Sequence, residues 1–236
     1  MDELPRIGLG TYDNTDPEQC ADVVAAALEM GYRHLDTAQE YDNEAYVGDG
    51  LTRADVDREE FFLATKVWDD NLAYDDVLSS TEDSLDRLGV DGLDLLYVHW
   101  PRDTYDPEET LPAFDELYDE GTIDHVGVSN FTTGQLDTAR ETLDAPIFAH
   151  QVEMHPLLQQ EELQEYAREH DHWLVAYSPV ARGKVTEVEE IREVAEKHDA
   201  TPYQVSLAWL AAKENVAAIP KTSSEEHLQD NFEARE

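Results

Sequence analysis

Residues 31–44 read GYRHLDTAQEYDNE, an apolar run that ends in an acid and is followed by a polar loop carrying a tyrosine. Taken alone, the segment fits a strand, a loop and a helix with Asn43 as its N-cap. However, the same arrangement, an apolar run that ends in a polar or aromatic residue, recurs along the chain. That recurrence decides which fold the sequence predicts.

Eight such runs are expected to be strands. They are near-continuous rather than alternating in polarity, as in parallel strands buried on both faces, and a helical pattern follows each one. Thr201-Pro202 begins a second helix in the seventh connection. The expected strands are RIGLGTY (6–12), YRHLDT (32–37), FFLATKVW (61–68), LDLLYVHW (93–100), DHVGVSN (124–130), IFAHQVE (147–153), WLVAYSP (173–179) and NVAAIPKT (215–222).

Eight strand–helix units in a chain of 236 residues predict a (β/α)8 TIM barrel that forms a single domain over residues 1–236. The alternative is a doubly wound open sheet, which needs a Gly-rich phosphate loop after an early strand. The sequence GLG at 8–10 lacks the rest of that fingerprint. Within the barrel, the first helix should begin with Asp16 as N-cap and Pro17 as its first residue, and should end at Gly31.

The chain is strongly acidic: 55 Asp and Glu against 16 Lys and Arg give a formal net charge of −39. A hydrophobic content of 41% argues against disorder, and the acids lie between the apolar runs, mostly on expected helix faces. This pattern suits a halophilic protein, because the Debye length falls to roughly 3 Å at 1 M salt and self-repulsion is then screened. Without a basic stripe, nucleic-acid binding is disfavoured.

Cys20 is the only cysteine, so an intrachain disulfide and a CxxC site are excluded. No apolar segment approaches the roughly 18 residues that a membrane span requires, and the segment MDELPRIG lacks the features of a signal peptide. We therefore expect a cytoplasmic protein without a membrane partner, and we also expect a monomer.

In a (β/α)8 barrel the active site lies at the C-terminal ends of the strands. Each residue at an expected strand end also has a purely structural interpretation: Lys66 as a solvated residue, His99 as a core histidine, Tyr177 as core packing. Together they are expected to converge on one mouth. The residues in question are Thr11, Tyr12, Asp36, Lys66, Trp68, His99, Trp100, Ser129, Asn130, Gln151, Glu153, Tyr177, Ser178, Lys221 and Thr222.

Seven motifs occur in the order and spacing of the aldo-keto reductase family, which the sequence resembles from Leu4 to Asn231. They are GYRHLDTAQEYDNE, ATKVW, LLYVHWP, VGVSNF, HQVEMHP, AYSPVARG and IPKTS. Among members of the family, the chain is most similar to compact microbial reductases of diketogluconate and small aldehydes. The resemblance implies NAD(P)H-dependent reduction of aldehydes or ketones to alcohols. The alternative is a cofactor-binding subunit of the same fold without catalysis, with a structural or regulatory role.

The resemblance also implies roles for four residues. Tyr41 would be the proton donor, and Lys66 would lower its pKa, since an ammonium favours a neighbouring phenolate. Asp36 would hold Lys66, and His99 would orient the oxygen of the substrate. Hydride transfer belongs to the cofactor, so the protein has to supply position and electrostatics.

The family likewise implies where substrate and cofactor lie. Tyr12, Trp68 and Trp100 would form an aromatic substrate pocket. The nicotinamide ring would stack on Tyr177. The other residues expected at that end of the cofactor are Thr11, Ser129, Asn130 and Gln151.

Ser178 and Val180 are expected to line the path of the pyrophosphate. NADPH is expected to be preferred over NADH, with NADH used measurably, because Lys221 remains while a histidine occupies the place of a common arginine. The residues expected around the adenosine and its 2′-phosphate are Lys221, Thr222, Ser224, His227, Asp230 and Asn231.

The chain departs from the family pattern in several places. His227 replaces an arginine, Asp230 a glutamate, and His150 a common asparagine. The sequence stops at NFEARE, inside an expected helix, so we expect a (β/α)8 barrel that lacks the family's final C-terminal helix and tail, as a short form or a fragment.

The segment HQVEMH resembles the spacing of metal ligands. On a strand, however, His150 and Glu153 point to opposite faces, so with His155 they cannot easily share an ion. No metal site is expected. The segment HDH at 170–172 is interpreted as a solvated helix end.

Overall fold

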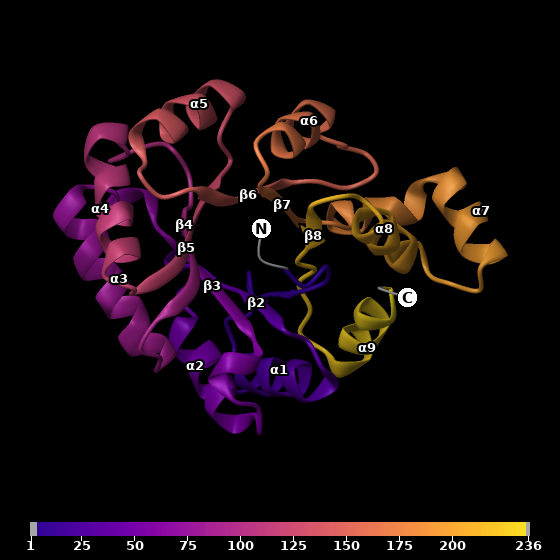
Figure 1. Ribbon diagram of the computed structural model, residues 1–236. Coiled ribbons are helices and arrows are strands. Elements are labelled where there is room, and N and C mark those ends of the chain that lie inside the picture. Colours follow the sequence, from indigo (N-terminus) through magenta and orange to yellow (C-terminus); the bar gives the residue numbers. More distant parts are fainter. Residues whose placement is uncertain (1–3, 235–236) are drawn as a thin grey trace.

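The computed structural model of the chain describes residues 4–234, and its centre is one sheet of eight parallel strands (Figure 1). The strands pair in chain order, each with the next. They are β1 (Leu9–Gly10), β2 (His34–Asp36), β3 (Phe62–Val67), β4 (Leu93–Val98), β5 (Ile123–Ser129), β6 (Ile147–Glu153), β7 (Trp173–Tyr177) and β8 (Val216–Ala218). The expected strands are therefore all present, and most of them end before the polar residues that follow them.

The two outer strands of this sheet, β1 and β8, are joined by backbone bridges. Ile7 is bridged to Ala218 and Gly10 to Lys221, both in parallel sense. The Gly8 N–H donates to the Ala218 carbonyl over 2.8 Å, and the Gly10 N–H donates to the Pro220 carbonyl over 3.2 Å. These bonds close the sheet into a (β/α)8 barrel, as predicted.

Helices surround the strands (Figure 1). The α-helices are α1 (Pro17–Met30), α2 (Glu44–Arg53), α3 (Tyr74–Leu88), α4 (Pro107–Asp119), α5 (Thr133–Thr142), α6 (Glu161–Glu169), α7 (Glu189–Lys197), α8 (Pro202–Ala211) and α9 (Glu225–Glu233). Short 3₁₀ helices lie between them: η1 (Gln39–Tyr41), η2 (Arg58–Glu60), η3 (Asp69–Asn71) and η4 (Ala181–Glu187). None of the helices in residues 4–234 is long and apolar enough to cross a membrane.

The ends of α1 follow the predicted signals. The Asp16 side chain accepts from the Gln19 N–H, Pro17 is the first helical residue, and Gly31 closes the helix with φ 107°. A side chain at residue 31 would be strained in this left-handed conformation. Its Cβ would also lie 3.1 Å from Phe232 on α9, which packs on the adjacent Tyr32.

The apolar residues form two layers. On β4, Leu96 and Val98 face the helices, whereas Leu95 and Tyr97 face the interior of the barrel. Burial on both sides explains why the strands read as continuous apolar runs. Lys66 pairs with Tyr97 in the register between β3 and β4 and is itself fully buried, so it lies among the residues of the barrel interior.

Asn43 is the N-cap residue of α2, as its position suggested, but its side chain makes no capping bond. Its amide instead donates to the carbonyls of Thr11 and Asn14 and accepts from the Thr37 hydroxyl. Asn43 is fully buried, and its side chain hydrogen-bonds two carbonyls of the loop after β1, of which that of Thr11 also accepts from the Asn14 N–H.

Candidate active site

The centre of the candidate site is a buried ion pair between two neighbouring strands. Asp36 is the last residue of β2, and Lys66 lies near the end of β3. The Lys66 ammonium donates to Asp36 Oδ1 over 2.5 Å and to the Thr37 carbonyl over 2.8 Å. Both side chains are almost completely buried, so the pair holds each charge in place at the mouth-side end of the barrel interior.

Tyr41 reaches the same pair from the turn that follows β2. Its hydroxyl lies 3.4 Å from the Lys66 ammonium. Burial raises the pKa of Tyr41 above its ordinary value, and the charge of Lys66 opposes this shift. The lysine therefore limits an increase in pKa and does not produce a net decrease.

The charge of Lys66 is stabilised by its neighbours. Burial disfavours the ammonium, but Asp36 and Tyr41 together outweigh that effect, and the pKa of Lys66 is raised. Lys66 is therefore charged at neutral pH and can stabilise negative charge that develops on the Tyr41 oxygen when its proton leaves.

His99 follows β4 and faces the same space. Its ring lies 5.9 Å from the Tyr41 ring and 5.3 Å from the Trp68 ring, edge to face in both cases. Burial, reinforced by Lys66 and Arg102, lowers the pKa of His99 to about 3. The imidazole is therefore neutral at pH 7 and can donate a hydrogen bond without bringing a second full positive charge next to Lys66.

The predicted nicotinamide-end residues form a connected hydrogen-bond network next to this centre. The Tyr177 hydroxyl donates to Asn130 Oδ1 over 3.0 Å. The Asn130 amide donates to the Ser129 hydroxyl and to the His99 carbonyl. Gln151 donates to Asp36 Oδ2 over 2.8 Å, which links this network to the ion pair.

Thr11 occupies a different kind of position. It is fully buried, and its hydroxyl donates to the Asp36 carbonyl over 3.2 Å. Its own carbonyl accepts from Asn43. The first bond joins the residue after β1 to the end of β2, and the second joins it to the start of α2.

The loop after β7 has an unusual backbone. Ser178, Ala181 and Arg182 have positive φ, as does Gly183. Two N–H groups of this loop are used within it: that of Ala181 donates to the Ser178 carbonyl and that of Gly183 to the Val180 carbonyl. Val180 lies in this loop and packs on the core, whereas Arg182 is exposed. Arg182 is a cation that the sequence analysis did not single out.

The segment between β8 and α9 carries the residues predicted at the adenosine. Lys221 is exposed, whereas Thr222 is buried and its carbonyl accepts from Asn14. Ser224 caps α9, accepting from the N–H of His227 over 3.3 Å, and His227 is exposed on the first helical turn.

Two further residues of this prediction lie on α9. Asp230 is half-buried, and its carbonyl accepts from the Gln204 amide; Asn231 is buried. The structure thus places the predicted adenosine residues on the β8–α9 segment, separate from the Asp36–Lys66 centre.

Aromatic rings line the mouth above Tyr41. Tyr12 is 60% exposed, and its ring meets the Tyr41 ring edge to face at 5.3 Å. Trp68 contacts His99 as described. Trp100 is connected to them through Arg102, whose guanidinium carbon lies 4.7 Å from the Trp100 ring centre and 5.9 Å from that of Trp68. Arg102 also pairs with the buried Asp69.

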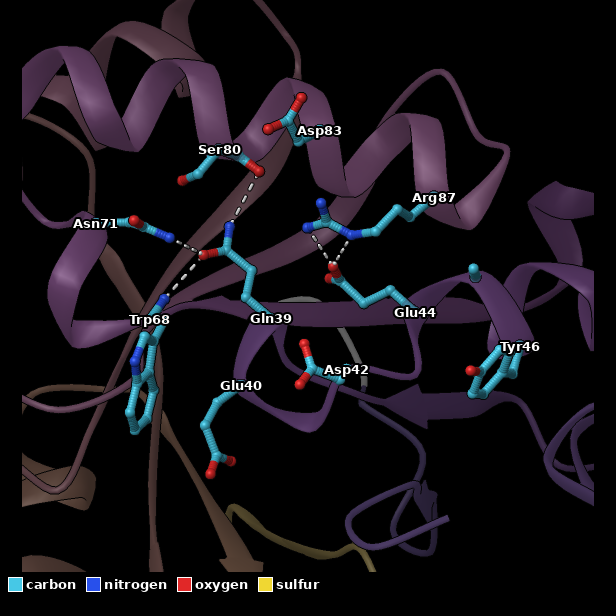
Figure 2. A pocket seen from close by; sticks show the side chains of 11 residues that line it. Gln39, Glu40, Asp42, Glu44, Tyr46, Trp68, Asn71, Ser80, Asp83 and Arg87 are labelled. Carbon is cyan, nitrogen blue, oxygen red and sulfur yellow. Dashed lines mark hydrogen bonds and ion pairs between the residues drawn. The ribbon is translucent and has the colours of Figure 1, made fainter. Parts of the chain in front are cut away.

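A cavity of about 480 Å³ lies beside the turn that carries Tyr41 (Figure 2). It opens between η1, α2 and α3, and its lining is mostly polar and acidic. Gln39 is hydrogen-bonded at its wall, as is the pair of Glu44 and Arg87. The sequence analysis missed Gln39; its position two residues before Tyr41 was the available signal.

The histidines of the HQVEMH segment have other roles. His150 Nε2 accepts from the Phe131 N–H over 3.1 Å, whereas His155 lies 3.2 Å from Glu153. Within residues 4–234, no group of three or more His, Cys, Asp or Glu could hold a metal ion.

The interpretation of the HDH segment as a solvated helix end was wrong at one residue. His170 and Asp171 are exposed, but His172 is fully buried because it directly precedes β7, and it lies 2.8 Å from an Arg140 nitrogen. Burial, together with Arg140, lowers the pKa of His172 to about 3.

Comparison with known proteins places this arrangement among carbonyl reductases. A sequence model described as the Aldo/keto reductase family matches residues 6–236. The methylglyoxal reductase DkgB of Escherichia coli O157:H7 is 38% identical over 235 residues, which cover 98% of this chain and 87% of that protein.

Two further matches agree with it. The glyoxal reductase of Bacillus subtilis (strain 168) is 37% identical over 230 residues, 97% of this chain and 82% of that protein. A crystal structure of a variant of the protein Gox0644 in complex with NADPH superposes with a TM-score of 0.90, at 36% identity, covering 98% of this chain and 83% of that one.

Proposed function

The chain belongs to the aldo/keto reductase family and is an oxidoreductase that acts on carbonyl groups, and on this basis we propose that it reduces small 2-oxoaldehydes to hydroxy carbonyl compounds with NADPH. The observation that carries the proposal is the meeting of Asp36, Tyr41, Lys66 and His99 at one end of the barrel. The substrate class follows from the glyoxal and methylglyoxal reductases among the relatives.

The residues present fit a dinucleotide cofactor. Tyr177 offers a half-buried ring beside Asn130, and the left-handed loop after β7 carries the exposed Arg182. Lys221 is a further exposed cation on the segment that leads to the N-terminus of α9, where anions are favoured. When bound, NADPH supplies the hydride that the carbonyl carbon accepts.

The side chains at the centre divide the remaining work. Neutral His99 donates a hydrogen bond to the carbonyl oxygen and orients it. Tyr41 transfers its proton to that oxygen as negative charge develops there. Lys66 stabilises the phenolate that remains, and Asp36 keeps Lys66 charged and in place.

We assign Ser129, Asn130 and Tyr177 to the nicotinamide end of the cofactor. One hydrogen-bond network connects these three side chains, so they can act there together. Gln151 would have to share its amide between Asp36 and a carboxamide, since its nitrogen already donates to Asp36.

A role as a cofactor-binding subunit without catalysis is not favoured, because the four central residues are all present and the named relatives are reductases. We further propose a monomeric, single-domain cytoplasmic protein adapted to high salt. The net charge of −39 supports the adaptation.

The test is a set of steady-state assays in molar KCl that follow NADPH consumption with methylglyoxal, glyoxal, a simple aldehyde and a simple ketone. We expect the highest kcat/KM with the 2-oxoaldehydes. Equal or better turnover of the simple aldehyde would contradict the proposed substrate class, and no turnover with any carbonyl would contradict catalysis itself.

A further inference from the structure

The side chain of Gln39 connects the turn that carries Tyr41 to two other elements. Gln39 begins η1 and is half-buried. Its Oε1 accepts from the backbone N–H of Trp68 over 3.0 Å and from the Asn71 amide over 3.1 Å. Its Nε2 donates to the Ser80 carbonyl over 3.0 Å and to the Ser84 hydroxyl over 3.1 Å.

These partners determine the orientation of the amide. A backbone N–H such as that of Trp68 can only donate, and the Ser80 carbonyl can only accept. Exchanging the oxygen and nitrogen of Gln39 would therefore place donor against donor and acceptor against acceptor. The residue needs both halves of an amide, and Figure 2 shows it between Trp68, Asn71 and Ser80.

Within the turn, the Tyr41 ring packs edge to face on Tyr12 and His99. Gln39 and Tyr41 are half-buried, Glu40 is exposed, and the residue that follows, Asp42, has φ 51°. The backbone hydrogen bonds of the turn are local: the Tyr41 N–H donates to the Ala38 carbonyl and the Asp42 N–H to the Gln39 carbonyl. The Gln39 amide therefore supplies the turn with hydrogen bonds to α3 and to the end of β3.

The same amide acts on both sides of the reacting space. Through η1 it sets the position of Tyr41, whose hydroxyl is only 3.4 Å from Lys66. Through the Trp68 N–H it sets the start of η3, next to the ring that contacts His99. A shift at Gln39 would thus displace the proton donor relative to Lys66 and to the substrate.

We propose that Gln39 is a positioning residue for carbonyl reduction, which holds Tyr41 and Trp68 in one rigid unit anchored on α3. This inference rests on the proposed function. A displacement of the order of 1 Å at a reacting group can cost about 100-fold in rate, so the amide can affect turnover without touching the substrate.

Two variants separate positioning from general support of the fold. Gln39→Ala removes all four bonds, and we expect kcat to fall by about 10- to 100-fold with unchanged NADPH affinity. Gln39→Glu keeps both accepted bonds but presents a carboxylate to the Ser80 carbonyl at neutral pH. A protonated glutamic acid can donate there, so its kcat relative to wild type should recover as the pH falls towards about 5.

A matched control is Gln164→Ala on α6, which lies across the barrel from α2, the helix that follows η1 in the chain (Figure 1). Gln164 is also half-buried, and its amide donates to the Gln159 carbonyl. It should keep wild-type kcat at every pH. Thermal melts at each pH exclude unfolding as the cause of a lost rate.

The experiment measures kcat and KM of the full chain with methylglyoxal between about pH 7.5 and 5, and NADPH affinity by fluorescence. Recovery in Gln39→Glu but not in Gln39→Ala supports the inference. If Gln39→Ala fails to fold, the pH dependence of Gln39→Glu decides alone. Wild-type kcat in either variant at neutral pH overturns the role of Gln39. So does a ratio of Gln39→Glu kcat to wild-type kcat that does not change with pH. An inactive wild type would instead overturn the proposed function.

Discussion

The Lys66 ammonium lies 3.4 Å from the Tyr41 hydroxyl, at the long limit of a hydrogen bond. At this distance the lysine only partly offsets the burial that raises the pKa of Tyr41. Tyr41 is therefore protonated at neutral pH, as a proton donor must be, and the positive charge of Lys66 has its largest effect once the proton has left.

Replacing Tyr41 with phenylalanine tests the proton donor. We expect Tyr41→Phe to abolish reduction in kcat while NADPH affinity stays close to wild type, because the ring remains and only the hydroxyl is lost. Steady-state kinetics with methylglyoxal and a fluorescence titration with NADPH measure the two effects. Turnover at the wild-type rate would show that another group supplies the proton.

Removing the lysine should affect both rate and stability. Lys66→Met leaves the Asp36 carboxylate buried, with Gln151 as the remaining side-chain partner among the described residues. We expect a severe loss of kcat and a loss of about 3–5 kcal/mol in the free energy of unfolding at pH 7. Urea unfolding monitored by circular dichroism checks the second value. An unchanged urea midpoint would mean that Asp36 is not left uncompensated.

Buried histidines make stability depend on pH. Burial lowers the pKa of His150 to about 3, whereas the unfolded chain protonates near 6.5. Below pH 6.5 the unfolded state binds more protons, so stability is complete above that pH and is lost as the pH falls towards 3. At pH 5, protonation of one such histidine in the unfolded state lowers the free energy of unfolding by about 2 kcal/mol.

The variant His150→Gln isolates this effect, because its carbonyl can accept from the Phe131 N–H without titrating. Between pH 7 and 5 it should lose less stability than wild type, by about 2 kcal/mol. His198→Gln, at an exposed histidine, should follow the wild-type curve. Parallel curves for all three proteins would show that His150 titrates normally.

Salt should stabilise the fold. With a net charge of −39, repulsion within the folded chain is long-ranged at low ionic strength and is screened in molar KCl. We expect the melting temperature to rise steadily from ~10 mM to molar KCl. A melting temperature that stays constant over this range would exclude halophilic adaptation.

Cofactor preference tests the β8–α9 segment. His227→Arg would add a planar guanidinium on the first turn of α9, next to Ser224 and beyond Lys221. We expect the ratio of kcat/KM for NADPH over NADH to increase. The increase should correspond to at most about 1–3 kcal/mol of transition-state free energy. Glu225→Gln changes the net charge by the same amount and should give a smaller increase. If the two variants gave equal increases, the effect would be one of net charge, and residue 227 would not contact the phosphate.

The fold and the meeting of the candidate catalytic residues could be predicted because both depend on local patterns. Each apolar run is a strand, and parallel strands bring their ends together, so Asp36, Lys66 and His99 meet without any knowledge of the helices. Tyr41 follows from the resemblance to a family. To place the three strand-end residues, it is enough to know which strands are neighbours in the barrel.

The rest depends on packing between distant helices and loops. The partners of Gln39 come from residues 68, 71, 80 and 84, and they meet only once α3 lies against the end of β3. Asn43 seemed a cap because its residue type favours that position, but buried carbonyls at Thr11 and Asn14 compete for its amide. His172 is polar and follows a helix, yet it is buried because it directly precedes β7.

Because the bridges between β1 and β8 join the two ends of the barrel sequence, the barrel can close only late in synthesis. During synthesis Asp36, Tyr41, Lys66 and His99 leave the ribosome before Ala218 and Lys221, so β1 lacks its β8 partner until that last part of the barrel has been made. Until that partner emerges, one edge of β1 is unpaired and open to other strands. The barrel can therefore close only after residues 216–221 have been made, and the first turnover should follow that closure.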